Sequence, residues 1–421
     1  MYTRSTCALL LLCAVQGCER FAFFAMLPLF ILYLQQHRGF TESGAVLLLG
    51  VFQALSYLGA LPAGAFTDRF LGRWPATLLG CVLLTLGYGA LALDRPVLLW
   101  PSLLLMLLGH GFFKPGLNSL ASHFFGANAA RRERGFLWLH CAINVGAMVS
   151  PLCSEWSRAQ GDWPGVFRWA TGGMLLGTIS LLPASLLEVP RAETRDTATV
   201  PVTDENVEQR RWPAIRLICT VGVIYWLTAQ QAGSSLVIFA EQNTQQRLLI
   251  GSSHIIVGAG HFASLHSLLV LALLPFLMGG TSLLRRRGWE PSTPAKMCWG
   301  YVATAAAFLA MAGACLRGGD GGRVSVGWLT GCYVFLSVAE LLLSPLGLSL
   351  LTRLSPPRRT SQTVGLWFAA VAVGNILAGL LGFAWVRWAH HRYFSLLVLL
   401  SLGAAALLLK RLRRLEAAIP R

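Results

Sequence analysis

Charged residues are scarce in this sequence, and their scarcity excludes an ordinary soluble domain. Only 12% of the 421 residues are charged, whereas 55% are hydrophobic and the mean hydropathy is +0.59. Soluble chains carry roughly 25% charged residues, about twice this share. Because a membrane-spanning helix needs about 20 apolar residues, the chain is long enough for about a dozen such helices with short loops.

Lysine is almost absent, since Lys114, Lys296 and Lys410 are the only lysines among 34 basic residues. The net charge of +16 would suit nucleic acid if the basic residues formed one surface. Nearly all the arginines lie instead between apolar runs. This is the distribution of membrane-topology signals, so nucleic acid is not an expected partner.

Motifs of enzymes and metal sites are also missing from the sequence. The ten cysteines are scattered, almost all within apolar runs, and none forms a C-x-x-C pair, so we interpret them as small buried hydrophobic residues. There is no Gly-rich phosphate loop, no Ser/His/Asp set and no carboxylate cluster with metal spacing. We therefore expect neither enzyme activity nor a cofactor or metal.

What the sequence does contain is a series of long apolar segments. The first continues across Glu19-Arg20 to Leu34, which is too long for a removable signal peptide, so we interpret it as a membrane span. Loops on one side of the spans hold 23 basic residues against nine on the other, so we expect both termini to be cytoplasmic. The twelve expected transmembrane helices are 6–35, 44–66, 74–93, 97–122, 136–156, 165–187, 213–240, 254–283, 296–316, 325–351, 361–387 and 393–410.

One long polar connection divides these spans into two sets of six. We predict an N-terminal six-helix bundle over 1–187, a cytoplasmic linker over 188–212 and a C-terminal six-helix bundle over 213–421. An all-α membrane protein with this six-plus-six layout is typical of the major facilitator fold. In that fold the substrate binds near the bilayer midplane between the two halves.

Three polar residues share one face of the first span. Gln16, Glu19 and Arg20 stand at i, i+3 and i+4, so a helix places them together. A charged side chain in hydrocarbon is costly and normally faces a partner or a water-filled cavity. This face is therefore expected to look inward, away from lipid.

Two further charges lie inside apolar spans. Lys114 follows Gly109 and Gly111, glycines that let a neighbouring backbone approach closely, and Glu340 lies in the span 325–351. Each charge would otherwise be unpaired in hydrocarbon, so we expect the two to pair across the two halves. A purely structural ion pair is the alternative to a solute path.

Weaker candidates are polar or aromatic residues that also have structural explanations. Interhelical hydrogen bonding accounts equally well for polar residues in the span 213–240, a lone His usually packs without acting as a ligand, and Trp can be an interfacial anchor. These candidates are Asn144, Gln230, Gln231, Ser234, Ser235, His266 and Trp367.

At these residues the chain resembles the proton-dependent oligopeptide transporter (POT) family of the major facilitator superfamily. Residues 16–24 (Q-G-C-E-R-F-A-F-F) resemble E-x-x-E-R-F-x-Y-Y, and 63–73 (A-G-A-F-T-D-R-F-L-G-R) resemble G-G-W-L-A-D-R-x-L-G-R. Further stretches that resemble family motifs, in the family's order, are 111–115 (G-F-F-K-P), 143–147 (I-N-V-G-A), 233–236, 340–349 and 365–368.

The resemblance implies alternating-access import of di- and tripeptides together with protons. It implies that Arg20 and Lys114 hold the peptide carboxylate, Glu340 the amino terminus and Asn144 the peptide backbone. Lys114 and Glu340 would also form a gate by pairing across the halves. Gln230, in span seven, and Trp367, in the motif of span eleven, complete the predicted substrate-binding set.

The departures from the family pattern concern proton coupling. Gln16 replaces the first Glu of the signature, and Phe23 and Phe24 replace its two tyrosines. Family members often form an outer gate from an Arg and a Glu. Here the position of the Arg matches Leu27 or Pro28, and the position of the Glu matches Gln230. Glu19 and Glu340 remain as the expected proton-coupling carboxylates, with His110 and His266 as possible substitutes.

Three functions are consistent with these residues. The first is a proton-coupled importer of small peptides. The second is an uncoupled facilitator, or a carrier of another anionic or zwitterionic solute such as nitrate or a peptide-like metabolite. Phe23, Phe24 and Gln230 favour it, because they make the pocket less polar and less titratable. The third is a membrane sensor without transport. We expect a monomer in a bacterial inner membrane.

Overall fold

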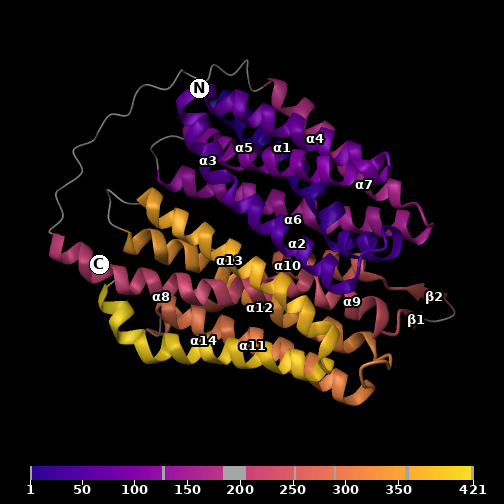
Figure 1. Cartoon of the computed structure of the whole chain (residues 1–421). Helices are drawn as coiled ribbons and strands as arrows, with labels where there is room; N and C mark the ends of the chain where they lie inside the picture. Colours follow the sequence, from indigo (N-terminus) through magenta and orange to yellow (C-terminus); the bar gives the residue numbers. More distant parts are fainter. Residues whose placement is uncertain are drawn as a thin grey trace. The chain divides into compact units, whose positions relative to one another are not determined.

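The computed structural model describes residues 2–125, 129–183, 205–250, 253–288, 291–355 and 360–418. For some residues within these ranges it describes the backbone alone. Nearly all of these described residues are helical (Figure 1). Within the described residues, 10 helical segments are long and apolar enough to cross a membrane. The prediction of an all-α, multi-pass membrane protein is confirmed.

The chain folds into two compact units, which are described separately. The first comprises residues 1–40, 55–196 and 259–268, and the second 41–54, 197–258 and 269–421. The predicted division at 188–212 stays a prediction, and most of that linker lies outside the described residues.

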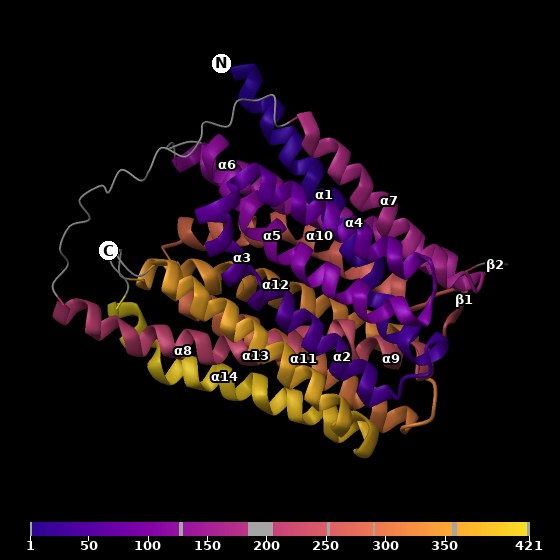
Figure 2. The ribbon, with the colours of Figure 1, turned by 45° about the horizontal axis from the view of Figure 1, so that its top comes forward.

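The first unit is built around α1, which contacts α6 and α7, while α4 packs on α5 and α7. Figure 2 shows α1, α4 and α7 side by side. Its elements are α1 (Tyr2–Leu32), η1 (Tyr33–His37), α3 (Ala60–Phe66), η2 (Thr67–Leu71), α4 (Arg73–Ala92), η3 (Pro96–Leu98), α5 (Leu99–Phe125), α6 (Ala129–Ala159) and α7 (Trp163–Leu181).

The second unit packs α11 against α12 and α14, and α8 against α13. The expected span 213–240 is interrupted here, because a 3-10 turn at η5 separates α8 from α9. The elements are α8 (Glu205–Ala229), η5 (Gln230–Gly233), α9 (Ser235–Gln242), β1 (Arg247–Ile250), β2 (Ser253–Ile256), α11 (Thr293–Gly318), α12 (Val326–Leu354), α13 (Thr360–Arg387) and α14 (His390–Ala418).

Two helices belong partly to each unit: α2 (Glu42–Leu58) and α10 (Ala259–Arg286). The first part of α2 packs on α13 in the second unit, where Trp385 Nε1 donates a hydrogen bond to Glu42 at 3.0 Å. A Cβ on Gly50 would lie 2.5 Å from the carbonyl oxygen of Asn375, so only glycine allows this approach.

The first part of α10 packs on α6 in the first unit. Oε2 of Glu155 accepts a hydrogen bond from the backbone N–H of Gly260 at 3.0 Å, and Arg158 pairs with the same carboxylate. The carboxylate thereby caps the start of α10, where backbone N–H groups lack helical partners. Each of these two continuous helices therefore contributes residues to both units.

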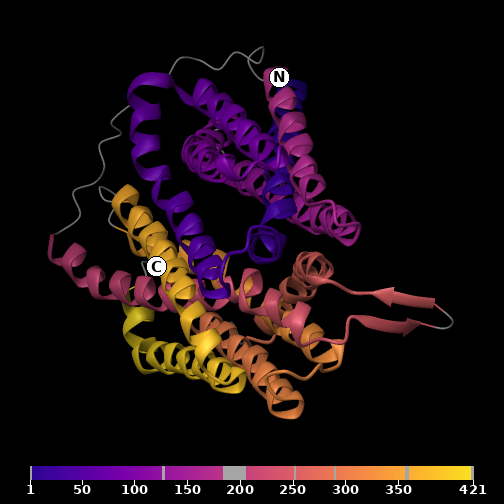
Figure 3. The same cartoon turned by 45° about the vertical axis from the view of Figure 1, so that its right-hand side comes forward.

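A β-hairpin replaces the predicted start of one span. We expected a helix over 254–283, but β1 and β2 pair antiparallel from Arg247 opposite Ile256 to Ile250 opposite Ser253. The helix α10 begins only at Ala259. The hairpin projects from the helices as two arrows in Figure 3. The prediction failed because short apolar runs suit a strand and a helix equally well.

Candidate functional site

The polar face of α1 carries a buried ion pair. Nε and Nη2 of Arg20 each donate to the Glu19 carboxylate at 2.5 Å, and Gln16 Nε2 donates to it at 3.4 Å. The Glu19 side chain is fully buried, whereas that of Arg20 is 13% exposed. The carboxylate is therefore satisfied as an anion, while part of the guanidinium remains accessible.

His110 of α5 is a second partner of this carboxylate. Its Nδ1 lies 3.3 Å from Oε1 of Glu19, and both side chains are fully buried. The ring of Phe23 meets the imidazole edge-on, with 5.3 Å between centroids, and also lies under the Arg20 guanidinium at 4.8 Å. The aromatic ring that replaces a family tyrosine therefore packs against both His110 and Arg20.

Lys114 lies one helical turn beyond His110 on α5. Its ammonium is 4.0 Å from the centroid of the Tyr57 ring and donates to the carbonyl oxygen of Ser56 at 3.4 Å. It is also within electrostatic range of Arg20 and Glu19. The first unit thus brings the predicted residues Glu19, Arg20 and Lys114 into one cluster with an excess of positive charge.

Glycines hold the helices of this cluster close together. A Cβ on Gly111 of α5 would lie 3.1 Å from the carbonyl oxygen of Gly59, and one on Gly109 would lie 2.7 Å from Leu84. On α6, a Cβ on Gly146 would lie 2.5 Å from the carbonyl oxygen of Gly17. The close approach expected from the glycines beside Lys114 is confirmed.

Asn144 lies on α6, two residues before this contact with α1. Its amide nitrogen donates to the carbonyl oxygen of His140 at 3.0 Å and lies 3.2 Å from the imidazole Nε2 of the same residue. The side chain is buried, with 5% exposed. Its expected contact with substrate stays a prediction.

The two adjacent glutamines of η5 in the second unit differ in their surroundings. Oε1 of Gln231 accepts from Tyr393 at 2.6 Å and from Ser235 at 2.7 Å, and its Nε2 donates to the carbonyl of Leu227. Gln230 is also buried, but within the described residues its Nε2 has no hydrogen-bond partner. Gln231 therefore joins α8, α9 and α14, while the expected contact of Gln230 with substrate stays a prediction.

Glu340 and Trp367 also lie in the second unit. Glu340 is half-buried on α12, close to the helix-internal Pro345. The Trp367 ring fills the space beside two glycines, since a Cβ on Gly347 would lie 2.6 Å from it and one on Gly222 2.9 Å. This packing accounts for the tryptophan structurally, and its role in substrate binding stays a prediction.

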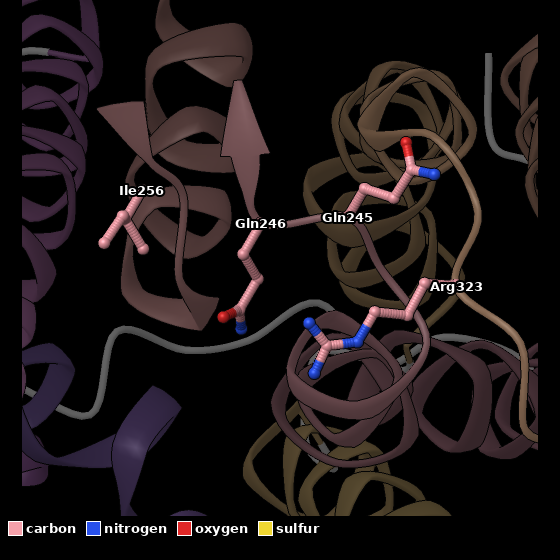
Figure 4. Close-up of a pocket in the computed structure, with 4 residues that line it drawn as sticks. All are labelled: Gln245, Gln246, Ile256 and Arg323. Atoms are coloured by element: carbon pink, nitrogen blue, oxygen red, sulfur yellow. The ribbon is translucent and has the colours of Figure 1, made fainter. Parts of the chain in front are cut away.

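A separate cavity of about 450 Å³ lies at the base of the hairpin, lined by Gln245, Gln246, Ile256 and Arg323. In Figure 4 the Arg323 guanidinium and the Gln246 amide point into the space between strand and loop. The Gln246 amide also donates to Glu241 at 3.0 Å. None of the residues predicted to bind substrate lines this cavity. Across the described residues, no three His, Cys, Asp or Glu side chains are grouped as metal ligands.

Solved structures share this fold. A POT family transporter in complex with a thioalcohol-conjugated peptide matches with a TM-score of 0.87 at 21% identity, covering 97% of this chain and 96% of that chain. A peptide transporter POT in complex with sulfate matches with a TM-score of 0.86 at 22% identity, covering 98% and 95%. The major facilitator architecture is confirmed.

Sequence relatives and a family model agree with the fold. A peptide transporter, YePEPT, of Yersinia enterocolitica subsp. palearctica is 27% identical over 86% of this chain and 85% of its own length. Dipeptide and tripeptide permease A of Proteus mirabilis is 25% identical over 88% and 85%. The POT family model matches residues 76–187 and 192–385, so the chain belongs to the POT family. It is an integral, multi-pass inner-membrane protein.

Two residues that were minor candidates from the sequence, His110 and Gln231, join different helices in the structure. His110 was one of several histidines within apolar spans, and its partner Glu19 lies 91 positions away in sequence. From the sequence, Gln231 was only one of four similar polar residues. In the structure its Oε1 accepts a hydrogen bond from the hydroxyl of Tyr393 of α14. The signal for His110 was its position four residues before Lys114, which places both on one helix face.

Proposed function

We propose that this protein is a secondary active transporter that imports di- and tripeptides with protons by alternating access. The observation that carries the proposal is the buried cluster of Glu19, Arg20 and Lys114 in a chain of the POT family. Two cations beside one carboxylate leave a positive charge in excess, which suits the carboxylate of a peptide. The peptide transporters among the relatives support the same substrate class.

The roles follow from the chemistry of each side chain. Arg20 and Lys114 hold the peptide carboxylate, because a guanidinium binds a carboxylate through two parallel hydrogen bonds and an ammonium adds a second charge. Glu340 holds the peptide amino terminus, Asn144 the peptide backbone, and Gln230 and Trp367 line the site. Between transport steps Lys114 and Glu340 pair and act as a gate.

Proton coupling needs a group that gains and loses a proton during each cycle. Gln16 cannot serve, because an amide does not titrate at physiological pH. Glu19 and Glu340 are the carboxylates proposed for this role. Glu19 is held as an anion by Arg20, so removal of Arg20 by a peptide carboxylate would leave a buried negative charge that needs a proton at Glu19 or at a group beside it.

An uncoupled carrier of peptides or of another small anion is the second candidate. The observation that favours it is the Phe23 ring, which packs against both Arg20 and His110 where the family motif has a tyrosine. A phenyl ring supplies no hydroxyl to a peptide backbone. A smaller anion such as nitrate would still find the excess positive charge.

Uptake of labelled dialanine into proteoliposomes separates these functions. We expect accumulation above the external concentration when a proton gradient points inward, and its loss when an uncoupler is added. Equilibration without accumulation would establish a peptide facilitator. Absence of dialanine uptake, together with uptake of nitrate, would replace the peptide by a small inorganic anion.

A further inference from the structure

His110 is a buried titratable residue to which the roles above assign no task. The imidazole is the side chain whose ordinary titration lies nearest physiological pH. Many histidines in membrane helices only pack, but this one lies 3.3 Å from a fully buried carboxylate, Glu19. The contact has the distance of an ion pair, so a proton on His110 would be stabilised directly by Glu19.

The surroundings of His110 define which charges act on its proton. Glu19 and Arg20 face it from α1, and Lys114 lies on its own helix. Tyr88 and Cys81 of α4 are within electrostatic range of Glu19. Glu19 is therefore the anion able to hold an imidazolium, and Arg20 competes with His110 for it.

Binding of substrate changes the competition between Arg20 and His110 for Glu19, because it changes the charges in the cluster. Without peptide, Glu19 has Arg20 as its counterion, and Lys114 adds a second positive charge. A peptide carboxylate that takes Arg20 brings one negative charge and leaves Glu19 without its bidentate partner. One proton restores both the counterion of Glu19 and the net charge of the cluster, which matters because uncompensated charge is costly in a buried site.

We propose that His110 binds the coupled proton and so replaces the carboxyl group that Gln16 lacks. The proton enters from the outside water with the peptide and binds to Nε2 of the neutral imidazole. The resulting imidazolium pairs through Nδ1–H with Glu19 while Arg20 holds the substrate. When the peptide leaves to the inside, Arg20 returns to Glu19 and the proton is released there. The inference rests on the proposed peptide transport and names the proton site within it.

The test uses the full-length protein in proteoliposomes and two measurements. Counterflow exchange of labelled dialanine without a proton gradient reports substrate binding and alternating access. Accumulation under an inward gradient reports coupling, and one pH unit with one coupled proton supports at most about tenfold accumulation. His110→Asn keeps an amide donor near the position of Nδ1 but cannot titrate. We expect exchange within about twofold of wild type and an accumulation ratio near one, that is, about tenfold lower.

Matched variants separate coupling from structure. His391→Asn changes a histidine near the start of α14 to which no role is assigned, and it should accumulate dialanine as wild type does. In the double variant Gln16→Glu/His110→Asn, a carboxyl group lies beside Glu19, because Gln16 Nε2 is 3.4 Å from Glu19 Oε2. Two adjacent carboxyl groups share a proton readily, so we expect accumulation to return.

Three results would overturn the inference. Gradient-driven accumulation by His110→Asn at the wild-type level would show that the imidazole carries no coupled proton. Loss of both exchange and accumulation in His110→Asn and in His110→Gln would assign the residue to folding or binding. Absence of exchange in the wild-type protein would overturn the proposed peptide transport, and this inference with it.

Discussion

Gly146 of α6 lies directly against Gly17 of α1, with the place of its missing Cβ only 2.5 Å from the Gly17 carbonyl oxygen. Gly146→Ala should therefore force α6 away from α1 and destabilise the protein by about 1–3 kcal/mol, as overpacking does. The measurement is the midpoint of thermal unfolding in detergent. Gly172→Ala is the control, because a Cβ there meets nothing within 4 Å. Equal midpoints for both variants would contradict the close contact.

The proposed charged pair predicts a functional loss without a folding defect. Lys114→Ala and Glu340→Ala should each abolish dialanine exchange, because each removes a group proposed to hold one end of the peptide. Lys410→Ala, which changes an exposed lysine near the end of α14, should exchange normally. Amounts in the membrane are compared by immunoblotting. Normal exchange by both single variants would refute the paired-charge site.

Glu19 should be needed for coupling more than for movement of substrate. Glu19→Gln removes the anion that Arg20 and His110 contact but keeps the size of the side chain. We expect accumulation of dialanine under an inward proton gradient to vanish while counterflow exchange persists. Loss of exchange as well would assign Glu19 to substrate binding or to folding.

Substitution of the two glutamines of η5 should have different effects on thermal stability and on dialanine exchange. Gln231→Leu leaves the hydroxyls of Tyr393 and Ser235 without their acceptor in the core, which costs about 1–3 kcal/mol for an unsatisfied group. Gln230→Leu removes an amide whose Nε2 has no partner in the described structure, so thermal stability should change little while dialanine exchange falls. Thermal unfolding and exchange measured on both variants would test this. A stable Gln231→Leu protein would contradict the structural role.

The helices could be predicted from sequence, because a helix that crosses the hydrocarbon core of a bilayer needs a long run of apolar residues. The face shared by Gln16, Glu19 and Arg20 also followed from helical spacing, and the Glu19–Arg20 pair is formed. The hairpin at 247–256 was not predicted, although Gly251, Ser252 and Ser253 separate its two short apolar runs, because such runs suit a strand and a helix equally well. Contacts such as His110 with Glu19 depend on packing between helices distant in sequence, which one sequence does not encode locally.

The contact of α2 with α13 has a consequence for biosynthesis. Gly50 is made early, but the surface that accepts it, at Asn375 and Gly379 of α13, leaves the ribosome only near the end of translation. During that interval the glycine face of α2 has lipid or a chaperone as its neighbour. We therefore expect the contact of α2 with α13 to form only after α13 has been made, and a chain truncated before α13 to lack it.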